Sequence, residues 1–249
     1  MFSRPPSLVS ALCSLTLLAA MAWPEVSGAA VVRQPYLQLG TPNSMIVAWR
    51  TDVGDPVDSV VEYGTVFGTY DQTKTGTSAI PPSNSGVRDN FVNVTGLTPG
   101  TKYFYRVGTG GSVVAGTVDH FFVASPAVGT GTPFSAWVIG DSGNNSNNQR
   151  DVRDAMLAFT AGDSPDLFLH VGDIAYPSGT DSQWTSNHFA QYEAIQRNTP
   201  FWPSIGNHDN YTTGTDPGID PNVGAAPYME AHALPTAFAY RPCDPHARR

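Results

Sequence analysis

The sequence is poor in cysteine, which limits the ways in which the fold can be held together. Only two of its 249 residues are cysteines. Cys13 lies in an N-terminal segment that we expect to be removed, and the mature chain then keeps Cys243 alone. Export normally permits disulfides, but a single thiol cannot form one within the chain, so no disulfide contributes to its stability.

Positive charge is also scarce. The chain has 13 Lys and Arg against 21 Asp and Glu, which gives a formal net charge of −8 at pH 7. No stretch of the sequence forms a basic patch, whereas the phosphate backbone of a nucleic acid requires clustered Lys and Arg. The charge balance therefore argues against a nucleic-acid partner.

Long apolar runs are missing except near the N-terminus. Arg4 is followed by an apolar run over 8–22 and then by small residues at 27–30. This pattern is typical of a secretory signal peptide over residues 1–30, and the run is shorter than the about 20 apolar residues that span a bilayer. We therefore expect a secreted, extracellular protein without a membrane partner; an uncleaved N-terminal anchor is the alternative.

Glycine and proline, by contrast, are abundant, with 24 and 21 residues, and they indicate a turn-rich, β-heavy protein. Between 31 and 124, alternation of apolar and polar residues predicts strands at 44–50, 60–63, 91–94 and 102–107. Short strands at this spacing favour an antiparallel β-sandwich. We expect Trp49 in its core and the hydroxyl of Tyr103 bonded back to the backbone at a corner. This domain resembles a fibronectin type III module.

Residues 125–132, with a proline and two glycines, are the predicted linker, and the pattern changes after them. Helical spacing appears over 149–161 and 181–197. These helices alternate with three apolar runs that predict buried strands, at 134–139, 167–171 and 201–205. Alternation of strand and helix favours a mostly parallel sheet, in which binding loops gather at the carboxyl ends of the strands.

A polar loop directly follows each of these three strands. The loops read Gly-Asp-Ser-Gly at 140–143, Gly-Asp-Ile-Ala-Tyr at 172–176 and Gly-Asn-His-Asp at 206–209. Each is an ordinary turn sequence alone, but together they supply two carboxylates, a phenol, an amide and an imidazole. Hard cations take oxygen ligands, and a phenol of pKa about 10 ionises readily only on a strong Lewis acid. The set therefore predicts a metal pair, with a trivalent ion beside Tyr176.

With these motifs the chain resembles the purple acid phosphatases, of the metallophosphoesterase superfamily, over residues 33 to about 240. The resemblance extends to the first domain through Gln34–Leu37, Trp49, Tyr63–Gly64 and Gly96–Thr101. It implies an all-β, fibronectin type III-like N-terminal domain over 31–124. It also implies an α/β calcineurin-like metallophosphoesterase domain, an αββα sandwich, whose N-terminal half occupies 133–249.

The resemblance further implies a ligand set for two metals, ferric iron and a divalent ion that is zinc, manganese or iron. Asp141 and the phenolate of Tyr176 would bind the ferric ion, and Asp173 would bridge both ions. Asn207 would bind the divalent ion through its amide oxygen. His208 would contact the phosphoryl oxygens or protonate the leaving alcohol.

The remaining polar candidates have weaker signals. Asp209 could orient His208 by a hydrogen bond, as carboxylates behind a catalytic residue do, or it could cap a turn; both interpretations stay open. His170 lies in an apolar strand, and His188 shares a helix face with aromatic residues. We predict that these two histidines serve packing.

The function implied is that of a secreted acid phosphatase, which hydrolyses small phosphomonoesters with a hydroxide held by two metals. The family's Val-x-x-His and Gly-His-x-His motifs are not found in this sequence, so we expect a fragment that lacks these histidine ligands. The irregular tail over 241–249 favours a truncated or mis-spliced gene over a naturally short protein. The alternatives are an inactive secreted binding module, and a phosphodiesterase or pyrophosphatase on the same metal core.

Overall fold

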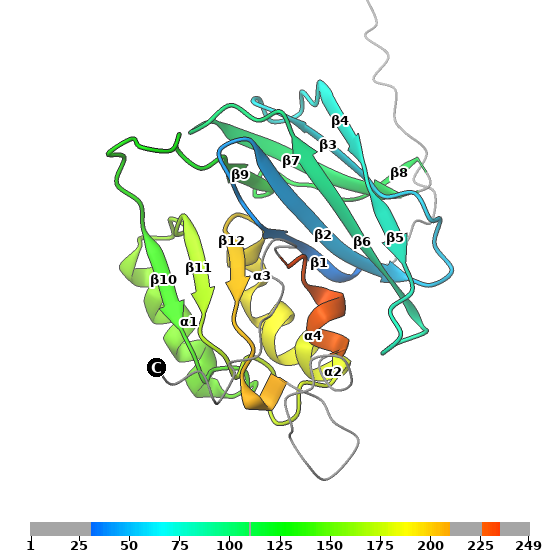
Figure 1. The fold of residues 1–249 in the computed structure, drawn as a ribbon, viewed down its shortest axis with the longest axis vertical. Coiled ribbons are helices and arrows are strands. Elements are labelled where there is room, and N and C mark those ends of the chain that lie inside the picture. The colour runs from blue at the N-terminus through cyan, green and yellow to red at the C-terminus, as the bar shows by residue number, and fades with distance from the viewer. Residues whose placement is uncertain (1–30, 110, 210–225, 235–249) are drawn as a thin grey trace, which may run out of the picture.

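The computed structural model describes residues 31–109, 111–209 and 226–234. The predicted signal peptide, both cysteines and the irregular tail lie outside the described residues. In Figure 1 a β-sandwich stands above three further strands that carry helices against one face. In the part of the chain that is described, no helix has the length and apolar character needed to cross a membrane.

The first domain is a sandwich of two antiparallel layers, as the alternation predicted. One layer has the order β4-β3-β7-β8 with β9 beside β7, and the other contains β1-β2-β6-β5. The strands are β1 Val31–Gln38, β2 Ser44–Asp52, β3 Val60–Gly64, β4 Gln72–Thr75, β5 Thr77–Ala79, β6 Val87–Thr95, β7 Lys102–Thr109, β8 Ser112–Ala115 and β9 Phe121–Val123.

Period-2 alternation explains why these strands face each other as they do. Along β7 every second side chain is buried, beginning with Tyr103, because successive side chains of a strand point to opposite faces. Trp49 is fully buried in the core between the layers, as predicted. The Tyr103 hydroxyl accepts a hydrogen bond from the Thr98 backbone N–H at 3.0 Å, so the predicted corner is also confirmed.

The second domain alternates parallel strands with helices. Residues pair in parallel from β10 to β11, for example Trp137 with Phe168, and from β11 to β12, for example Phe168 with Phe201. The elements are β10 Ala136–Ile139, α1 Asn147–Phe159, β11 Leu167–His170, α2 Asp181–Gln183, the π-helix η1 Trp184–Phe189, α3 Ala190–Gln196, β12 Pro200–Pro203, the 3₁₀ turn η2 Asn207–Asp209 and α4 Ala226–Ala231.

One seven-stranded sheet joins the two domains, which the sequence did not predict. Its order is β10-β11-β12-β1-β2-β6-β5. The junction is a parallel pairing of β1 with β12, in which Leu37 lies opposite Pro200 and Gln38 opposite Phe201. One layer of the sandwich therefore continues into the second domain.

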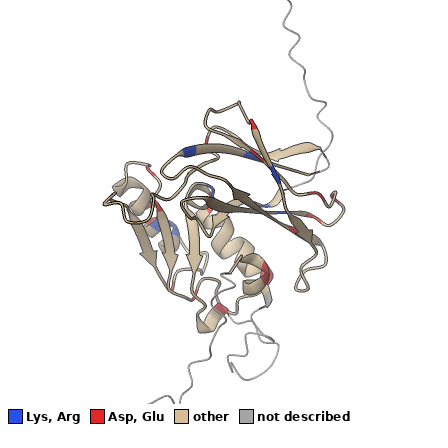
Figure 2. Cartoon of the chain, turned by 45° about the horizontal axis from the view of Figure 1, so that its top comes forward, with Lys and Arg blue, Asp and Glu red and all other residues tan. Residues whose placement is uncertain are grey.

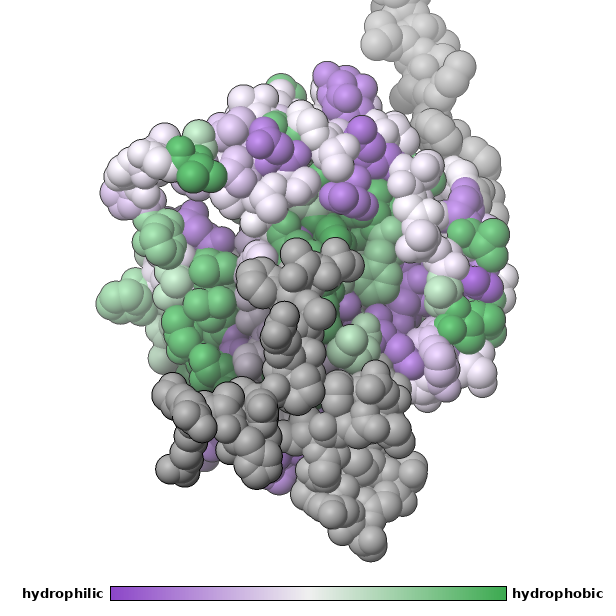
Figure 3. Space-filling view, viewed as in Figure 1, coloured by the Kyte–Doolittle hydropathy of each residue, from purple (hydrophilic) through white to green (hydrophobic). Residues whose placement is uncertain are grey.

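The prediction that 134–139 forms a buried strand is wrong in one respect. β10 is an edge strand whose side chains alternate between half-buried and exposed. Trp137 and Ile139 pack against the hydrophobic core of the second domain, called the second core below. Val138 is 53% exposed and Phe134 is 68% exposed. The strand is therefore covered on one face only, and Figure 3 shows hydrophobic side chains at the surface over this part of the sheet.

Both predicted helices form, with differences at the level of hydrogen bonding. α1 begins at Asn147, two residues before the prediction, because the Ser146 hydroxyl accepts a hydrogen bond from the Gln149 N–H. The helix predicted over 181–197 is divided into α2, η1 and α3. Thr180 and Gln183 form a reciprocal capping box at its start.

A buried ion pair adds to the contact between the domains. The guanidinium of Arg50, on β2, bonds both carboxylate oxygens of Asp89 at 2.6 and 2.8 Å, and it bonds Asp181 of α2 at 2.6 Å. Arg33 of β1 donates to the Thr185 hydroxyl of η1 at 3.0 Å. Elsewhere cations are sparse: in the view of Figure 2, Lys and Arg are scattered over both halves rather than gathered on one face.

Candidate metal centre

The three polar loops meet at the carboxyl ends of β10, β11 and β12, as a parallel sheet requires. Backbone hydrogen bonds fasten the first loop to the second. The Asp141 N–H donates to the Gly172 carbonyl at 3.0 Å, and the Tyr176 N–H donates to the Gly143 carbonyl at 2.7 Å. The two loops therefore form one unit before any metal is considered.

Glycine is required where these loops touch. A Cβ atom on Gly143 would overlap the Ile174 carbonyl oxygen, and one on Gly206 would overlap the Asp173 carboxylate. The glycines of the motifs thus allow close approach of backbone to backbone and of backbone to ligand. The sequence showed these glycines but not what approaches them.

Asp141 and Asp173 share an unusual backbone conformation. Both have φ of +56°, in the left-handed region, which only glycine and, less readily, Asn and Asp adopt without a large steric cost. Because this conformation turns the chain sharply at a strand end, it sends both carboxylates toward the same place. Asp141 is exposed and Asp173 is half-buried.

Three oxygen-bearing groups converge there. The Tyr176 hydroxyl bonds the Asp141 carboxylate and also the Asp173 carboxylate, the latter at 3.2 Å. None of the ion pairs among the described residues involves either carboxylate, although like charges this close disfavour each other. The hydrogen bond to Asp141, followed by desolvation and the charge of Asp173, raises the pKa of Tyr176. A bound cation would reverse that shift, because it favours the phenolate.

The third loop brings Asn207 and His208 to the same edge. The His208 N–H donates to the Asp173 carboxylate at 2.9 Å, and its ring lies 4.4 Å from that of Tyr176. The His208 Nδ1 is 2.7 Å from the Pro177 carbonyl oxygen. A carbonyl can only accept, so Nδ1 carries the hydrogen and Nε2 is left to exchange a proton. Asn207 precedes His208 on η2 and is exposed.

Asp209 does not orient His208. One of its carboxylate oxygens accepts from the N–H groups of Ile174 and Ala175, at 2.6 and 2.8 Å, and the other accepts from Gly206 at 2.8 Å. Asp209 is fully buried. The structure thus favours the interpretation of Asp209 as a turn cap, and this cap also fastens the third loop to the second. The alternative, that Asp209 orients His208 by a hydrogen bond, is wrong.

A further network lies beneath the loops, and sequence reasoning missed it. His170 is 1% exposed; its Nδ1 accepts from the Gly172 N–H at 3.3 Å and its Nε2 lies 2.8 Å from the Ser142 hydroxyl. Burial lowers the pKa of His170 to about 4, so the ring is neutral. The Tyr192 hydroxyl donates to Ser142 at 3.3 Å. The packing role predicted for His170 holds, but this residue also links the two ligand loops.

His188 packs as predicted and is remote from the oxygen cluster. It is fully buried, its ring contacts Phe201, and its Nε2 lies 2.5 Å from the Gln196 side chain. His232 is also buried, with its Nδ1 donating to the Tyr228 carbonyl at 2.7 Å. Within the described ranges, His208 is therefore the histidine that contacts the ligand loops from the solvent side.

The residues at this edge fit a hard cation. Among the described residues, no group of three or more His, Cys, Asp and Glu side chains gathers closely enough to hold a metal. The cluster instead has two carboxylates and a phenol, all oxygen donors, with carboxylates that lack a cationic partner. Oxygen donors of this kind suit a trivalent or hard divalent ion, so the donor set agrees with the predicted ligands Asp141, Asp173 and Tyr176.

Comparisons with known proteins agree with this architecture. The model of the purple acid phosphatase N-terminal domain matches residues 32–123, and that of the calcineurin-like phosphoesterase matches residues 134–240. The chain therefore has the domain order of a metallophosphoesterase preceded by a β-module. It belongs to the purple acid phosphatase family, and the predicted resemblance is confirmed.

Several relatives bear the name of this family. Probable inactive purple acid phosphatase 27 of Arabidopsis thaliana is 30% identical over 201 residues, which are 70% of this chain and 33% of the relative. A purple acid phosphatase of Glycine max is 28% identical over 140 residues, or 54% of this chain and 28% of the relative. The chain thus spans about a third or less of the length of these relatives.

The structural comparison supports the fold. A purple acid phosphatase from yellow lupin (Lupinus luteus) seeds superimposes with a TM-score of 0.62 at 21% identity, covering 81% of this chain and 40% of that one. The predicted fold class, a β N-terminal domain followed by a metallophosphoesterase domain, is confirmed by these matches.

Proposed function

We propose that this chain carries part of the centre of a metal-dependent acid phosphatase that hydrolyses small phosphomonoesters. One observation carries the proposal: Asp141, Asp173 and Tyr176 converge at one sheet edge, and no ion pair among the described residues neutralises the two carboxylates. Family membership supports the reaction class, because calcineurin-like phosphoesterases are hydrolases of phosphate esters.

The proposed roles follow from the positions of the side chains. Asp141 and Tyr176 would hold ferric iron, Asp173 would hold both ions, and Asn207 would hold the divalent ion, which is zinc, manganese or iron. A metal pair, when bound, activates water and neutralises the phosphoryl oxygens. His208, with Nδ1–H fixed on a carbonyl, would pass a proton from Nε2 to the leaving alcohol.

Secretion is part of the proposal. The pattern of residues 1–30, with Arg4 ahead of the apolar run, supports export as a signal peptide. That segment lies outside the described residues, so the support comes from the sequence. Export would place the phosphatase in the extracellular space, where small phosphorylated compounds would be its substrates.

A second candidate function is favoured by one observation. Three relatives from Arabidopsis thaliana are named "probable inactive purple acid phosphatase". A chain of that kind would keep the fold and a metal site without turnover, and would act as a secreted binding module. The two candidates differ in turnover and not in the metal ligands.

Metal content and turnover test the proposal together. The chain is loaded with Fe³⁺ and Zn²⁺, and bound metal is measured for Asp173→Asn, Asp141→Asn and the exposed control Asp154→Asn. Asp173→Asn is expected to lower both metals by more than 10-fold, because loss of even an outer-shell partner costs about 10–100-fold. Asp141→Asn should lower iron mainly, and Asp154→Asn neither.

The outcomes separate the candidates. Full loading of both metals in Asp173→Asn would overturn the ligand assignment. Loading that depends on Asp173, with turnover of a generic phosphomonoester at about pH 5, supports the phosphatase. The same loading without turnover, in the unaltered chain and also in a chain extended by the family's Val-x-x-His and Gly-His-x-His motifs, favours the binding module instead.

A further inference from the structure

A chain of amide hydrogen bonds joins Tyr176 to the helices behind it. The Asn187 side chain, on η1, donates through Nδ2 to the Tyr176 backbone carbonyl at 2.7 Å. The Asn187 backbone carbonyl in turn accepts from the Gln149 side chain of α1 at 2.6 Å. Gln149 accepts from the Asn145 N–H, in the loop after Asp141, at 2.7 Å. One path thus links both ligand loops through η1.

The geometry of η1 makes this path possible. The hydrogen bonds of a π-helix span one residue more than those of an α-helix, so it shifts the direction of the side chains, and such segments are frequent at functional sites. Gln149, which is only 4% exposed, has both ends of its amide engaged in the path. A buried amide with all these partners leaves little freedom to the groups that it joins.

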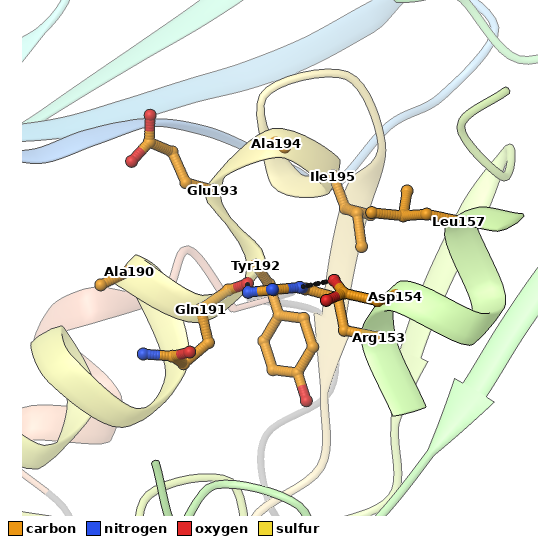
Figure 4. A pocket seen from close by; sticks show the side chains of 9 residues that line it. All are labelled: Arg153, Asp154, Leu157, Ala190, Gln191, Tyr192, Glu193, Ala194 and Ile195. Carbon is orange, nitrogen blue, oxygen red and sulfur yellow. Dashed lines mark hydrogen bonds and ion pairs between the residues drawn. The ribbon is translucent and has the colours of Figure 1, made fainter. Parts of the chain in front are cut away.

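A second contact one turn away joins α1 to α3, which directly follows η1, without contacting Tyr176. Arg153, one turn after Gln149 on α1, donates to the Gln191 carbonyl at 2.7 Å and also bonds Asp154. Figure 4 shows the Arg153 side chain in the cavity of about 360 Å³ between α1 and α3, which Tyr192 and Ile195 also line. Arg153 therefore provides an internal control: it braces the helices without contacting Tyr176.

We propose that Asn187 is a positioning residue for Tyr176, which fixes the phenol against Asp141 before a metal binds. This inference rests on the proposed function for the identity of the ligand, a hard cation held by Asp141, Asp173 and Tyr176. The Asn187 side chain donates to the Tyr176 backbone carbonyl and accepts from the Ser186 hydroxyl at 2.5 Å, so it acts through the position of the phenol and not on the metal. Loss of its amide frees the carbonyl and lets the loop carry the phenol away.

The first measurement is calorimetric titration of the full chain with Tb³⁺, a hard trivalent ion that oxygen donors prefer. Asn187→Ala is expected to weaken Tb³⁺ binding about 10-fold, the lower end of the range for outer-shell partners. In a Tyr176→Phe background the same substitution should change the affinity less than 2-fold, because the phenol is already lost. Arg153→Met should also change it less than 2-fold.

Two results would overturn the proposal. One is an Asn187→Ala affinity within 2-fold of the unaltered chain. The other is an equal loss in the Tyr176→Phe background, which would show a general structural effect. If Asn187→Ala does not fold, as judged by thermal melting, Asn187→Asp replaces it. The added negative charge of this variant would by itself tighten cation binding. Weaker binding of Tb³⁺ by Asn187→Asp would therefore support the positioning role of Asn187.

Amide exchange of the metal-free chain separates this proposal from the function on which it rests. Asn187→Ala should speed exchange of the Tyr176 amide, which bonds the Gly143 carbonyl, whereas Arg153→Met should not. If the unaltered chain binds no Tb³⁺, the proposed metal site fails, and exchange then decides alone. Faster exchange of the Tyr176 amide in Asn187→Ala supports the positioning role of Asn187, and unchanged exchange overturns it.

Discussion

The two cores of this protein differ in how far each is self-contained. The core of the sandwich consists of residues from β1 to β9 and the turns and bends beside them, such as Trp49, Tyr105 and Phe122. The second core includes Tyr36 and Ala48, which come from β1 and β2 of the first domain. The sandwich thus closes around its own side chains, while the half that bears the metal loops is completed by its neighbour.

The cores also differ in polarity. The sandwich core packs one buried histidine, His120, against Tyr105, whereas the second core encloses three, His170, His188 and His232, among aromatic rings. Buried polar groups are tolerated when they are bonded, and they become costly when a partner is removed. The comparison teaches that the second half depends on contacts that are more sensitive to substitution and to pH.

The largest expected effect is loss of the ion pair between the halves. Arg50→Met should lower the free energy of unfolding by about 3–5 kcal/mol, because it leaves Asp89 without its cation and leaves Asp181 with only the more distant Arg33, at 3.6 Å. Arg106→Met is the matched control, since its pair with Glu62 is partly exposed on the sandwich and should be worth about 0–1 kcal/mol. Urea unfolding measures both; equal costs would contradict the dependence of the second half on this contact.

Acid should weaken the second core next. Burial lowers the pKa of His232 to about 3 and that of His188 well below its usual value, and nearby Arg33 lowers both further. The unfolded chain takes up these protons below pH about 6.5, so stability is present above that pH and is lost as pH falls toward 3. The loss is about 1.4 kcal/mol per pH unit for each histidine.

His232→Asn tests this dependence, because its side-chain amide can still donate to the Tyr228 carbonyl. Between pH 7.5 and pH 5 the unaltered chain should lose about 2 kcal/mol more unfolding free energy than the variant. Urea unfolding at the two pH values gives the comparison. Parallel losses in the two proteins would show that His232 is not neutral in the folded state.

The smallest effect contrasts two tyrosines on one strand. The Tyr103 hydroxyl accepts from Thr98 within the sandwich, and the Tyr105 hydroxyl donates to the Arg197 carbonyl at the end of α3. Replacing either by Phe should cost about 1 kcal/mol, the net value of one hydrogen bond. Amide exchange should quicken around Thr98 in the first variant and around Arg197 in the second. If the same amides changed in both variants, the proposed difference between the two halves would be contradicted.

Much of the fold could be predicted because its signals are local. Strands β3, β6 and β7 follow alternation with period 2 over most of their length, and α1 follows a helical period. The convergence of the three polar loops followed from the rule that binding loops gather at the carboxyl ends of parallel strands. The ligands Asp141, Asp173 and Tyr176 were therefore grouped correctly in space, while their roles on metals remain predictions.

Other features have no local signal. The pairing of β1 with β12 joins distant segments, and nothing near Leu37 or Pro200 specifies it. The shift of η1 to π-helical bonding does not alter the apolar spacing that predicted a helix. The partners of Asp209 are backbone N–H groups, which every residue but proline carries, so only the folded loops could show which ones it binds.

The pairing of β1 with β12 separates the place where the domains meet in the sequence from the place where they meet in space. The linker over 125–132 is mostly exposed and contributes little to the contact between the domains. The pairing of β1 with β12 and the Arg50–Asp181 ion pair hold the domains together instead. A protease that cuts the linker would therefore yield two polypeptides that stay together as one particle. The linker has the sequence of a hinge, but the two domains do not depend on it to stay together.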